Sequence, residues 1–132
     1  MANTLSAIST AVRNVCADGV VDAYDGGTPG DASGDLQVRT SGGTTLLAEL
    51  TLANPAAGAA SSGTATLNAI TDDSSADNTG TAALARLRDR ANATVHEGTV
   101  STSGEFYNLN TTSITTGDRV ACTAMTITAP AS

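Results

Sequence analysis

Apolar residues recur every three or four positions near the start of the chain, which is the spacing of one helix face. The residues on this face are Leu5, Ile8, Val12, Val15 and Cys16. Asn3 or Thr4 can cap the start, the Ala-rich interior suits a helix, and a weaker pattern extends to about residue 24. The glycine-rich segment 26–30 then stops regular structure, so the pattern predicts a single helix at the edge of the fold.

From Asp35 onward apolar residues alternate with polar ones, which is the period of a half-buried strand. The clearest alternation runs from Leu46 to Leu52, and the residues around Arg90 have the composition of a hairpin turn. The other alternating stretches are 35–39, 64–69, 81–88, 94–100, 106–109 and 119–128. The last stretch is apolar on both faces, which favours a central position between two layers.

Short strands separated by Gly, Ser and Asn turns are typical of sandwiches and jelly rolls. We therefore predict a mainly β protein: an antiparallel β-sandwich or jelly roll of seven to nine short strands with one N-terminal α-helix. The 132 residues are expected to form one domain, with the helix in 1–25 and the sandwich in 35–132.

Composition and charge exclude several classes of function. A net charge of −7 argues against a nucleic-acid-binding protein, which needs a basic surface. No apolar run approaches the roughly 18 residues of a membrane span. The N-terminal stretch lacks the basic and continuous apolar regions of a secretion signal, so we expect the protein to be made in a host cytoplasm. In that reducing compartment Cys16 and Cys122 are expected to be small buried hydrophobes, with a disulfide as the lesser alternative.

Large apolar side chains are scarce. Leu, Ile, Val, Phe and Met make up about a fifth of the chain, and aromatic residues, Tyr24, Phe106 and Tyr107, only 2%. Because a fully buried large aliphatic side chain contributes only about 1.5–3 kcal/mol, the stability of an isolated monomer is expected to be small. Burial against copies of itself or a larger partner would add to it. The outer strand faces, rich in Thr, Ser and Ala, are expected to be nearly uncharged and to suit flat subunit contacts.

Two groups of acidic residues are candidates for cation binding. Asp72, Asp73 and Asp77 lie in one loop and could hold Ca²⁺, but the loop lacks the residue order of an EF-hand, and a solvated loop is favoured. The second group is interpreted mainly as solubilising surface; its members are Asp18, Asp22, Asp25, Asp31 and Asp35. No metal or cofactor is therefore expected.

Arg86, Arg88 and Arg90 alternate along one stretch and would project from one strand face and its turn. Arginine pairs with carboxylates through two hydrogen bonds, so the three are a possible docking site for an acidic partner surface. The equally weighted alternative is a solvated strand edge that resists aggregation.

His96 beside Glu97 suggests a general base. The sequence places no nucleophile to serve it, so an exposed histidine on a strand is the favoured interpretation. We expect no catalytic residues and no enzymatic activity.

Three stretches together resemble a family of small proteins encoded by tailed bacteriophages: MANTLSAISTAVRN, NPAAGAASSGTATLNAITDDSSADNTGTAALARLRD and NLNTTSITTGDRVACTAMTIT. The resemblance covers most of the chain and rests on segments rich in Ala, Thr, Gly and Asp. It implies a virion structural protein, for which the preferred role is a capsid decoration (cement) protein. Such a protein sits over junctions between capsid subunits on the outer surface of the head, often as a trimer. Its partners would be further copies of itself and the major capsid protein or other virion proteins, with no nucleic acid and no membrane.

Two alternatives remain beside this role. The chain could be a tail component, such as a tube, terminator or fibre protein. It could also be a host-surface or glycan-binding module, which would need exposed aromatic rings for stacking, and only three aromatic residues are present.

Overall fold

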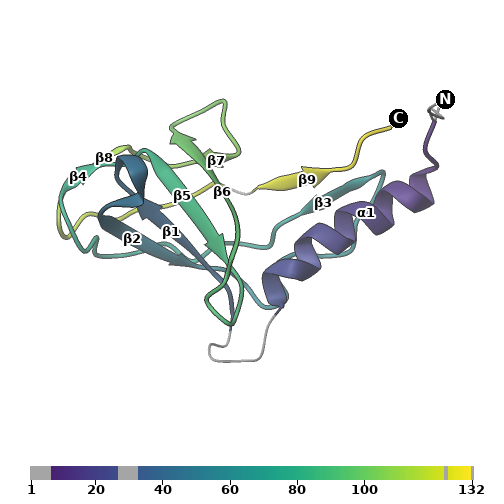
Figure 1. Ribbon diagram of the computed structural model, residues 1–132, viewed down its shortest axis with the longest axis horizontal. Helices are drawn as coiled ribbons and strands as arrows, with labels where there is room; N and C mark the ends of the chain where they lie inside the picture. The colour runs from purple at the N-terminus through teal and green to yellow at the C-terminus, as the bar shows by residue number, and fades with distance from the viewer. Residues whose placement is uncertain (1–6, 27–32, 124, 132) are drawn as a thin grey trace.

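The computed structural model describes residues 7–26, 33–123 and 125–131 (Figure 1). Helix α1 (Thr10–Asp22) continues into the short 3-10 turn η1 (Ala23–Asp25), and a second such turn, η2 (Ser41–Gly43), joins the first two strands. The strands of the described residues are β1 (Asp35–Arg39), β2 (Leu46–Thr51), β3 (Thr64–Thr66), β4 (Gly80–Thr81), β5 (Leu84–Arg88), β6 (Thr94–Ser101), β7 (Tyr107–Asn108), β8 (Ser113–Ile114) and β9 (Thr126–Thr128). The prediction of a mainly β protein with one N-terminal helix is confirmed, and the number of strands lies within the expected range.

Five strands form one sheet in the order β2-β1-β5-β6-β7. Its neighbours are antiparallel except for β6 and β7, which run parallel over two residue pairs. The register aligns Leu36 with Leu50 and with Leu87, and all three side chains are fully buried on one face. The alternation that the sequence shows in β1, β2 and β5 therefore marks the inner face of this sheet.

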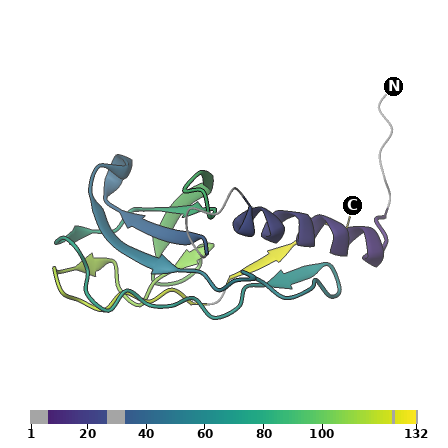
Figure 2. The same cartoon turned by 90° about the horizontal axis from the view of Figure 1, so that it is seen from below.

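A second layer covers that inner face (Figure 2). It contains the β4–β8 pair and the segment 109–123, whose Ile114 and Val120 belong to the same buried cluster as Leu36 and Leu87. Because apolar residues of both layers meet in one core, the arrangement is sandwich-like.

The predicted strand at 119–128 is wrong in its extent and in its central position. Val120 forms an isolated bridge with Asp73, and Cys122 forms one with Leu109. Among the described residues of this stretch, only Thr126–Thr128 form a strand, which pairs with β3 in a two-stranded sheet. Successive residues thus contact different segments, which explains why both faces of the stretch are apolar.

The helix and the β3–β9 pair extend from one end of the five-stranded sheet (Figures 1 and 2). We call α1, β3, β9 and the segment 56–63 the arm. α1 packs on the β3–β9 pair, and Ala17, Val21 and Ala65 are buried in the common core. Thr64 pairs with Thr128 in register, with their hydroxyl oxygens 3.1 Å apart. Here the strands carry the uncharged threonine surface that the sequence predicts.

The apolar face predicted for the helix is not the face that packs. Val12 and Val15 are 51% and 71% exposed, and Cys16 is also exposed, whereas Ala17 and Val21 are buried. The helix begins after Ser9, whose side chain accepts a hydrogen bond from the Val12 N–H. Ile8 precedes the helix; the remaining predicted positions, Leu5, Asn3 and Thr4, lie outside the described residues.

Polar bonds to the arm explain this orientation of the helix. The Asn14 side chain accepts from the Gly63 N–H at 2.7 Å, and the Asp18 carboxylate accepts from the Ala60 N–H at 2.7 Å. The Arg13 guanidinium donates to the Ala129 carbonyl oxygen at 3.2 Å from two of its nitrogens. Gly63 has φ +78°, and a side chain there would collide with that guanidinium. Polar partners, rather than the larger apolar side chains, select the packed face.

Candidate functional site

The face of the five-stranded sheet opposite the core carries a network of charged and amide side chains, which we call the polar face. The Arg88 guanidinium donates to both carboxylate oxygens of Asp35, at 2.8 and 2.7 Å, and to Glu49 at 3.3 Å. Arg86 pairs with Glu97 at 2.8 Å. Gln37 bridges Arg39 and Glu49, donating to Glu49 at 3.1 Å and accepting from Arg39 at 2.8 Å. Three arginines and three carboxylates make this face neutral.

The structure places the three candidate docking arginines in different surroundings. Arg86 and Arg88 share the polar face, where carboxylates of the same chain already bond them. Arg90 lies in the turn after β5, and its backbone N–H donates to the Gly26 carbonyl oxygen at 3.1 Å. β5 lies between β1 and β6, so Arg86 and Arg88 do not lie on a strand edge. The expectation of nearly uncharged outer strand faces also fails on this sheet.

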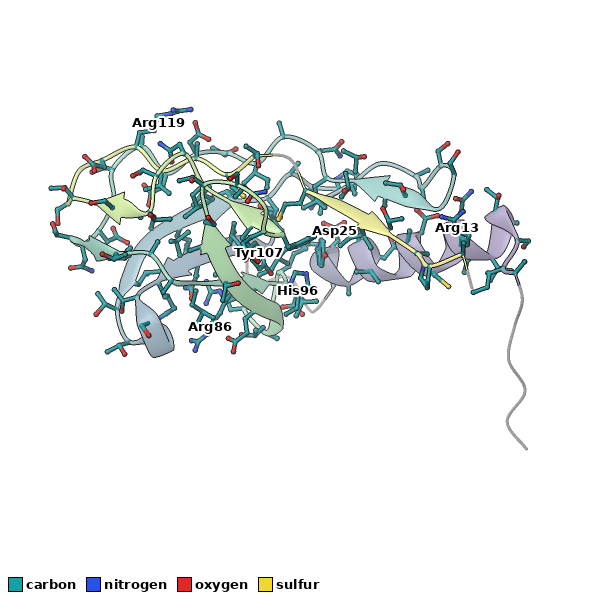
Figure 3. The ribbon with its side chains drawn as sticks, turned by 90° about the horizontal axis from the view of Figure 1, so that it is seen from above. Arg13, Asp25, Arg86, His96, Tyr107 and Arg119 are labelled. Carbon is teal, nitrogen blue, oxygen red and sulfur yellow. The ribbon has the colours of Figure 1, made fainter. Side chains whose placement is uncertain are left out.

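The acidic loop at 71–78 covers the free edge of β2. Thr71 pairs with Thr51, and the Asp77 N–H donates to the Leu47 carbonyl oxygen at 2.8 Å. The Asp73 carboxylate accepts from the Glu49 N–H at 3.0 Å. Asp72 is paired with Arg119, which lies far from the arm in Figure 3. Among the described residues no group of three potential ligands could hold a metal ion.

The other candidate acidic residues are distributed between bonds and surface. Asp25 accepts from the Ala56 N–H at 3.0 Å, as Asp18 does from Ala60, and Asp35 belongs to the polar face. Asp22 is exposed, and Asp31 lies outside the described residues. The interpretation as solubilising surface therefore fails for three of the five.

All the aromatic residues of the chain contact its single histidine, and Figure 3 shows His96 close to Tyr107. The Tyr24 hydroxyl is 2.8 Å from Nε2 of His96, and the Tyr107 hydroxyl bonds Nδ1. Phe106 packs edge-on against His96 and Tyr107, with ring centroids 5.4 and 4.9 Å apart. η1, β6, β7 and the loop before β7 bring these residues together, so the prediction of an exposed histidine is wrong.

Burial changes the proton affinity of this aromatic–histidine cluster. It lowers the pKa of His96 below 6.5 and raises the pKa of Tyr24 to about 12. The pKa of Tyr107 is raised further, by burial first and then by the neighbouring Tyr24. The imidazole is therefore neutral and both phenols are protonated at pH 7. Such a cluster suits packing and orientation; no sequence signal marks it, because its members come from three separate segments of the chain.

A groove of about 380 Å³ lies beside the cluster. Its lining comes from β6, from the loop into β7 and from β9: His96, Glu97, Gly98, Thr99, Glu105, Phe106, Tyr107 and Ile127. Phe106, Tyr107 and Ile127 form an apolar wall, while Glu97 and Glu105 contribute carboxylates. A Cβ at Gly98 would lie 3.4 Å from the Tyr107 ring, so this ring sits against the bare backbone.

Comparisons with known proteins give no match. No family model, no curated protein and no solved structure matches the chain. In the described part of the chain no helix is long and apolar enough to cross a membrane.

The remaining feature of note is the side of α1 that faces away from the β3–β9 pair. Spacing along the helix puts Val12, Val15, Cys16 and Gly19 on this side, which we call the outer helix face. Val20, 40% exposed, lies at its margin. The thiols of Cys16 and Cys122 are both free, and burial raises the pKa of Cys122 to about 11. Cys16 is exposed, contrary to the expectation that it would be buried.

Proposed function

We propose that the chain is a structural component of a tailed-phage virion, namely a capsid decoration (cement) protein that stabilises the head shell through contacts between subunits. Its partners are further copies of itself, as a trimer, and the major capsid protein or other virion proteins. The resemblance of its sequence to small tailed-phage proteins supports this role. The structural observation that supports it most is the outer helix face.

The outer helix face exposes apolar side chains to water, although large apolar side chains are scarce in this chain. Val12, Val15 and Val20 are the large exposed hydrophobic side chains of the described residues, and all three lie on α1. Burying one valine side chain contributes about 1.5 kcal/mol or more. Apolar residues grouped on one projecting element are typical of a surface that a partner covers. A decoration protein needs such a surface to attach to the shell.

The test compares two charge insertions on heads that lack the protein. Val15→Glu adds a charge to the outer helix face, and Ser74→Glu adds one to the exposed part of the 71–78 segment. Both sites are exposed, so both variants are expected to fold. We expect the wild-type protein and Ser74→Glu to bind the heads with equal affinity. Val15→Glu should bind them at least about tenfold more weakly.

Cys16 supplies a second readout of the same contact. An alkylating reagent should modify Cys16 in the free protein, held dilute and at low salt so that copies do not associate, and not in the protein bound to heads, while Cys122 stays unmodified in both. Absence of the protein from purified virions, or equal binding of Val15→Glu and wild type, would refute the proposal. Cryo-electron microscopy that places it on the tail would select the tail component instead.

The structure gives little support to a glycan-binding module. Tyr24 and Tyr107 are buried, with exposed fractions of 0% and 2%, and their hydroxyls bond His96. Two of the three aromatic rings are therefore not accessible for stacking on a sugar.

A further inference from the structure

The two edges of the five-stranded sheet differ in how they are covered. The segment 71–78 bonds to the backbone of β2 at one edge. At the other edge β7 pairs with β6 only through Val100 and Ser101. Within residues 7–26, 33–123 and 125–131, no strand or bridge pairs with residues 94–99 on the side away from β5. We call residues 94–99 of β6 the open edge.

The register shows which backbone groups point outward at the open edge. Gly98 is aligned with Ala85, and the Val100 N–H donates to the Ala83 carbonyl oxygen at 3.3 Å. Alternate residues of an antiparallel strand bond to the same neighbour, so Gly98 and Val100 face β5. The N–H and C=O groups of Glu97 and the N–H group of Thr99 consequently point toward the open edge, whereas the parallel pairing of Val100 with Tyr107 directs the Thr99 C=O at the Tyr107 N–H. Such groups are a template for a further strand.

The groove runs along this edge. His96, Glu97, Gly98 and Thr99 are consecutive, and all four line it. Side chains of consecutive strand residues alternate between the two faces of a sheet. A single groove that contacts four consecutive residues therefore lies beside the strand, along its edge, and not over one face of the sheet. A strand that bonded to Glu97 and Thr99 would therefore occupy the groove.

The two sides of the groove differ in chemistry. Glu97 shares the polar face with Arg86, and its side chain is 49% exposed. Glu105 is exposed and accepts a hydrogen bond from the Thr99 hydroxyl at 3.2 Å, which places it on the same side as Glu97. Of the two carboxylates in the lining, Glu97 is already paired with Arg86, so Glu105 carries the charge that a basic side chain would meet, while the apolar wall lies on the side of His96. A strand with basic side chains on one face and apolar side chains on the other complements both sides.

We propose that the open edge and its groove bind an extended segment of a partner protein as a sixth strand. Its apolar side chains lie against Phe106 and Ile127, and an arginine or lysine of the segment faces Glu105, next to the Arg86–Glu97 pair. A second copy of this chain fits less well, because antiparallel pairing of two β6 strands brings like carboxylates together. The inference goes beyond the virion role, since it holds for any protein that supplies the segment.

The experiment uses purified full-length protein and a blocked heptapeptide, Ser-Val-Arg-Val-Arg-Val-Ser. Its control is the same peptide with glutamate in place of arginine. Nuclear magnetic resonance follows the backbone amides during titration, and hydrogen exchange follows their protection. We expect the arginine peptide to shift and protect the amides of Glu97 and Thr99, and the glutamate peptide to bind at least about tenfold more weakly.

Two variants separate the backbone contribution from the charge. Thr99→Pro removes an outward N–H without removing a bond to β5, so the sheet is expected to tolerate it. Thr99→Pro should lower the affinity for the arginine peptide about three- to tenfold, the range for one lost hydrogen bond. Glu105→Lys should lower this affinity to a similar or greater degree. The matched charge reversal Asp77→Lys, at the covered edge, should leave binding unchanged.

The proposal is contradicted if the arginine peptide shifts no amide at millimolar concentration, or if the two peptides bind equally well. It is also contradicted if Thr99→Pro binds the arginine peptide as tightly as wild type does. Self-association that Thr99→Pro abolishes would contradict it too, because the occupant of the groove would then be a second copy of the chain. None of these results depends on virions, so a failure here is distinguishable from a failure of the decoration role.

Discussion

At the scale of single residues, His96 is held at both ring nitrogens by tyrosine hydroxyls. A neutral imidazole has one N–H and one lone pair, so one of the two hydroxyls donates to the ring and the other accepts from it. A second proton on the ring would turn both nitrogens into donors, and the hydroxyl that donates would lose its acceptor. The bonding pattern and the burial of the ring both favour the neutral form.

We predict that this preference makes stability depend on pH. Burial lowers the pKa of His96 in the folded protein below 6.5, the value of the unfolded chain. As pH falls through 6.5 the unfolded state takes up the proton first, so the free energy of unfolding decreases until the pH reaches the folded-state pKa. Urea unfolding at about pH 7.5 and pH 5.5 measures this loss. His96→Gln should show a smaller difference between the two pH values; an unchanged difference would assign the loss to other groups.

At the scale of elements, the polar face contains two ion pairs of similar length and different burial. The Arg88 and Asp35 side chains are 20% and 10% exposed, whereas those of Arg86 and Glu97 are 31% and 49% exposed. Water screens the second pair, and removing its arginine leaves a carboxylate that solvent can reach. Removing Arg88 leaves the Asp35 carboxylate mostly buried without its two-bond partner.

We therefore predict unequal effects of two identical substitutions on β5. Arg88→Ala should lower the free energy of unfolding by about 3 kcal/mol, the scale for breaking a buried pair. Arg86→Ala should lower it by about 0.5 kcal/mol, as for an exposed pair. Chemical denaturation of both variants measures the difference. Equal losses would show that burial does not set the contribution of these pairs.

The arm depends on side-chain bonds to backbone groups, and this leads to a local prediction. Asp18→Ala leaves the Ala60 N–H without its acceptor, which should cost about 1–3 kcal/mol. Hydrogen exchange should become faster in α1 and remain slow in β1 and β5. Asp22→Ala, at an exposed position of the same helix, serves as the control and should change neither the stability nor the hydrogen exchange of α1. Uniformly faster exchange over the whole chain would show that the arm does not open separately.

The sequence predicted those strands whose burial follows from the alternation of apolar and polar residues within the strand itself. Leu36 and Leu50 alternate with polar neighbours because one face of β1 and β2 is buried. The helix face was predicted wrongly because Asn14 and Asp18 bond to backbone groups more than forty residues away, which no local pattern reveals. The groove and the histidine cluster were missed for the same reason: they are made by segments that only the fold brings together.

At the scale of the whole molecule, one core cluster extends from the five-stranded sheet into the arm. The polar face is neutral, so the net charge of −7 resides on the rest of the chain. Copies of the protein therefore repel one another at low ionic strength, while the outer helix face favours their association.

We predict association at micromolar concentration that salt strengthens. At about 0.15 M salt the screening length is about 8 Å, so repulsion between copies largely disappears. Sedimentation velocity at about 10 µM should show a larger species in about 0.3 M than in about 0.02 M salt, and Val15→Glu should reduce it. A stable monomer with a cooperative melt under both conditions would contradict the expectation drawn from the small core.

The covering of β2 by residues 71–78 also sets the valency of the five-stranded sheet. A sheet that is open at both edges accepts a strand on each side, and chains joined in this way grow into filaments. With β2 covered, this sheet accepts one strand, at β6. Binding through it therefore saturates at one segment per chain, and any assembly made by this contact ends after a single junction.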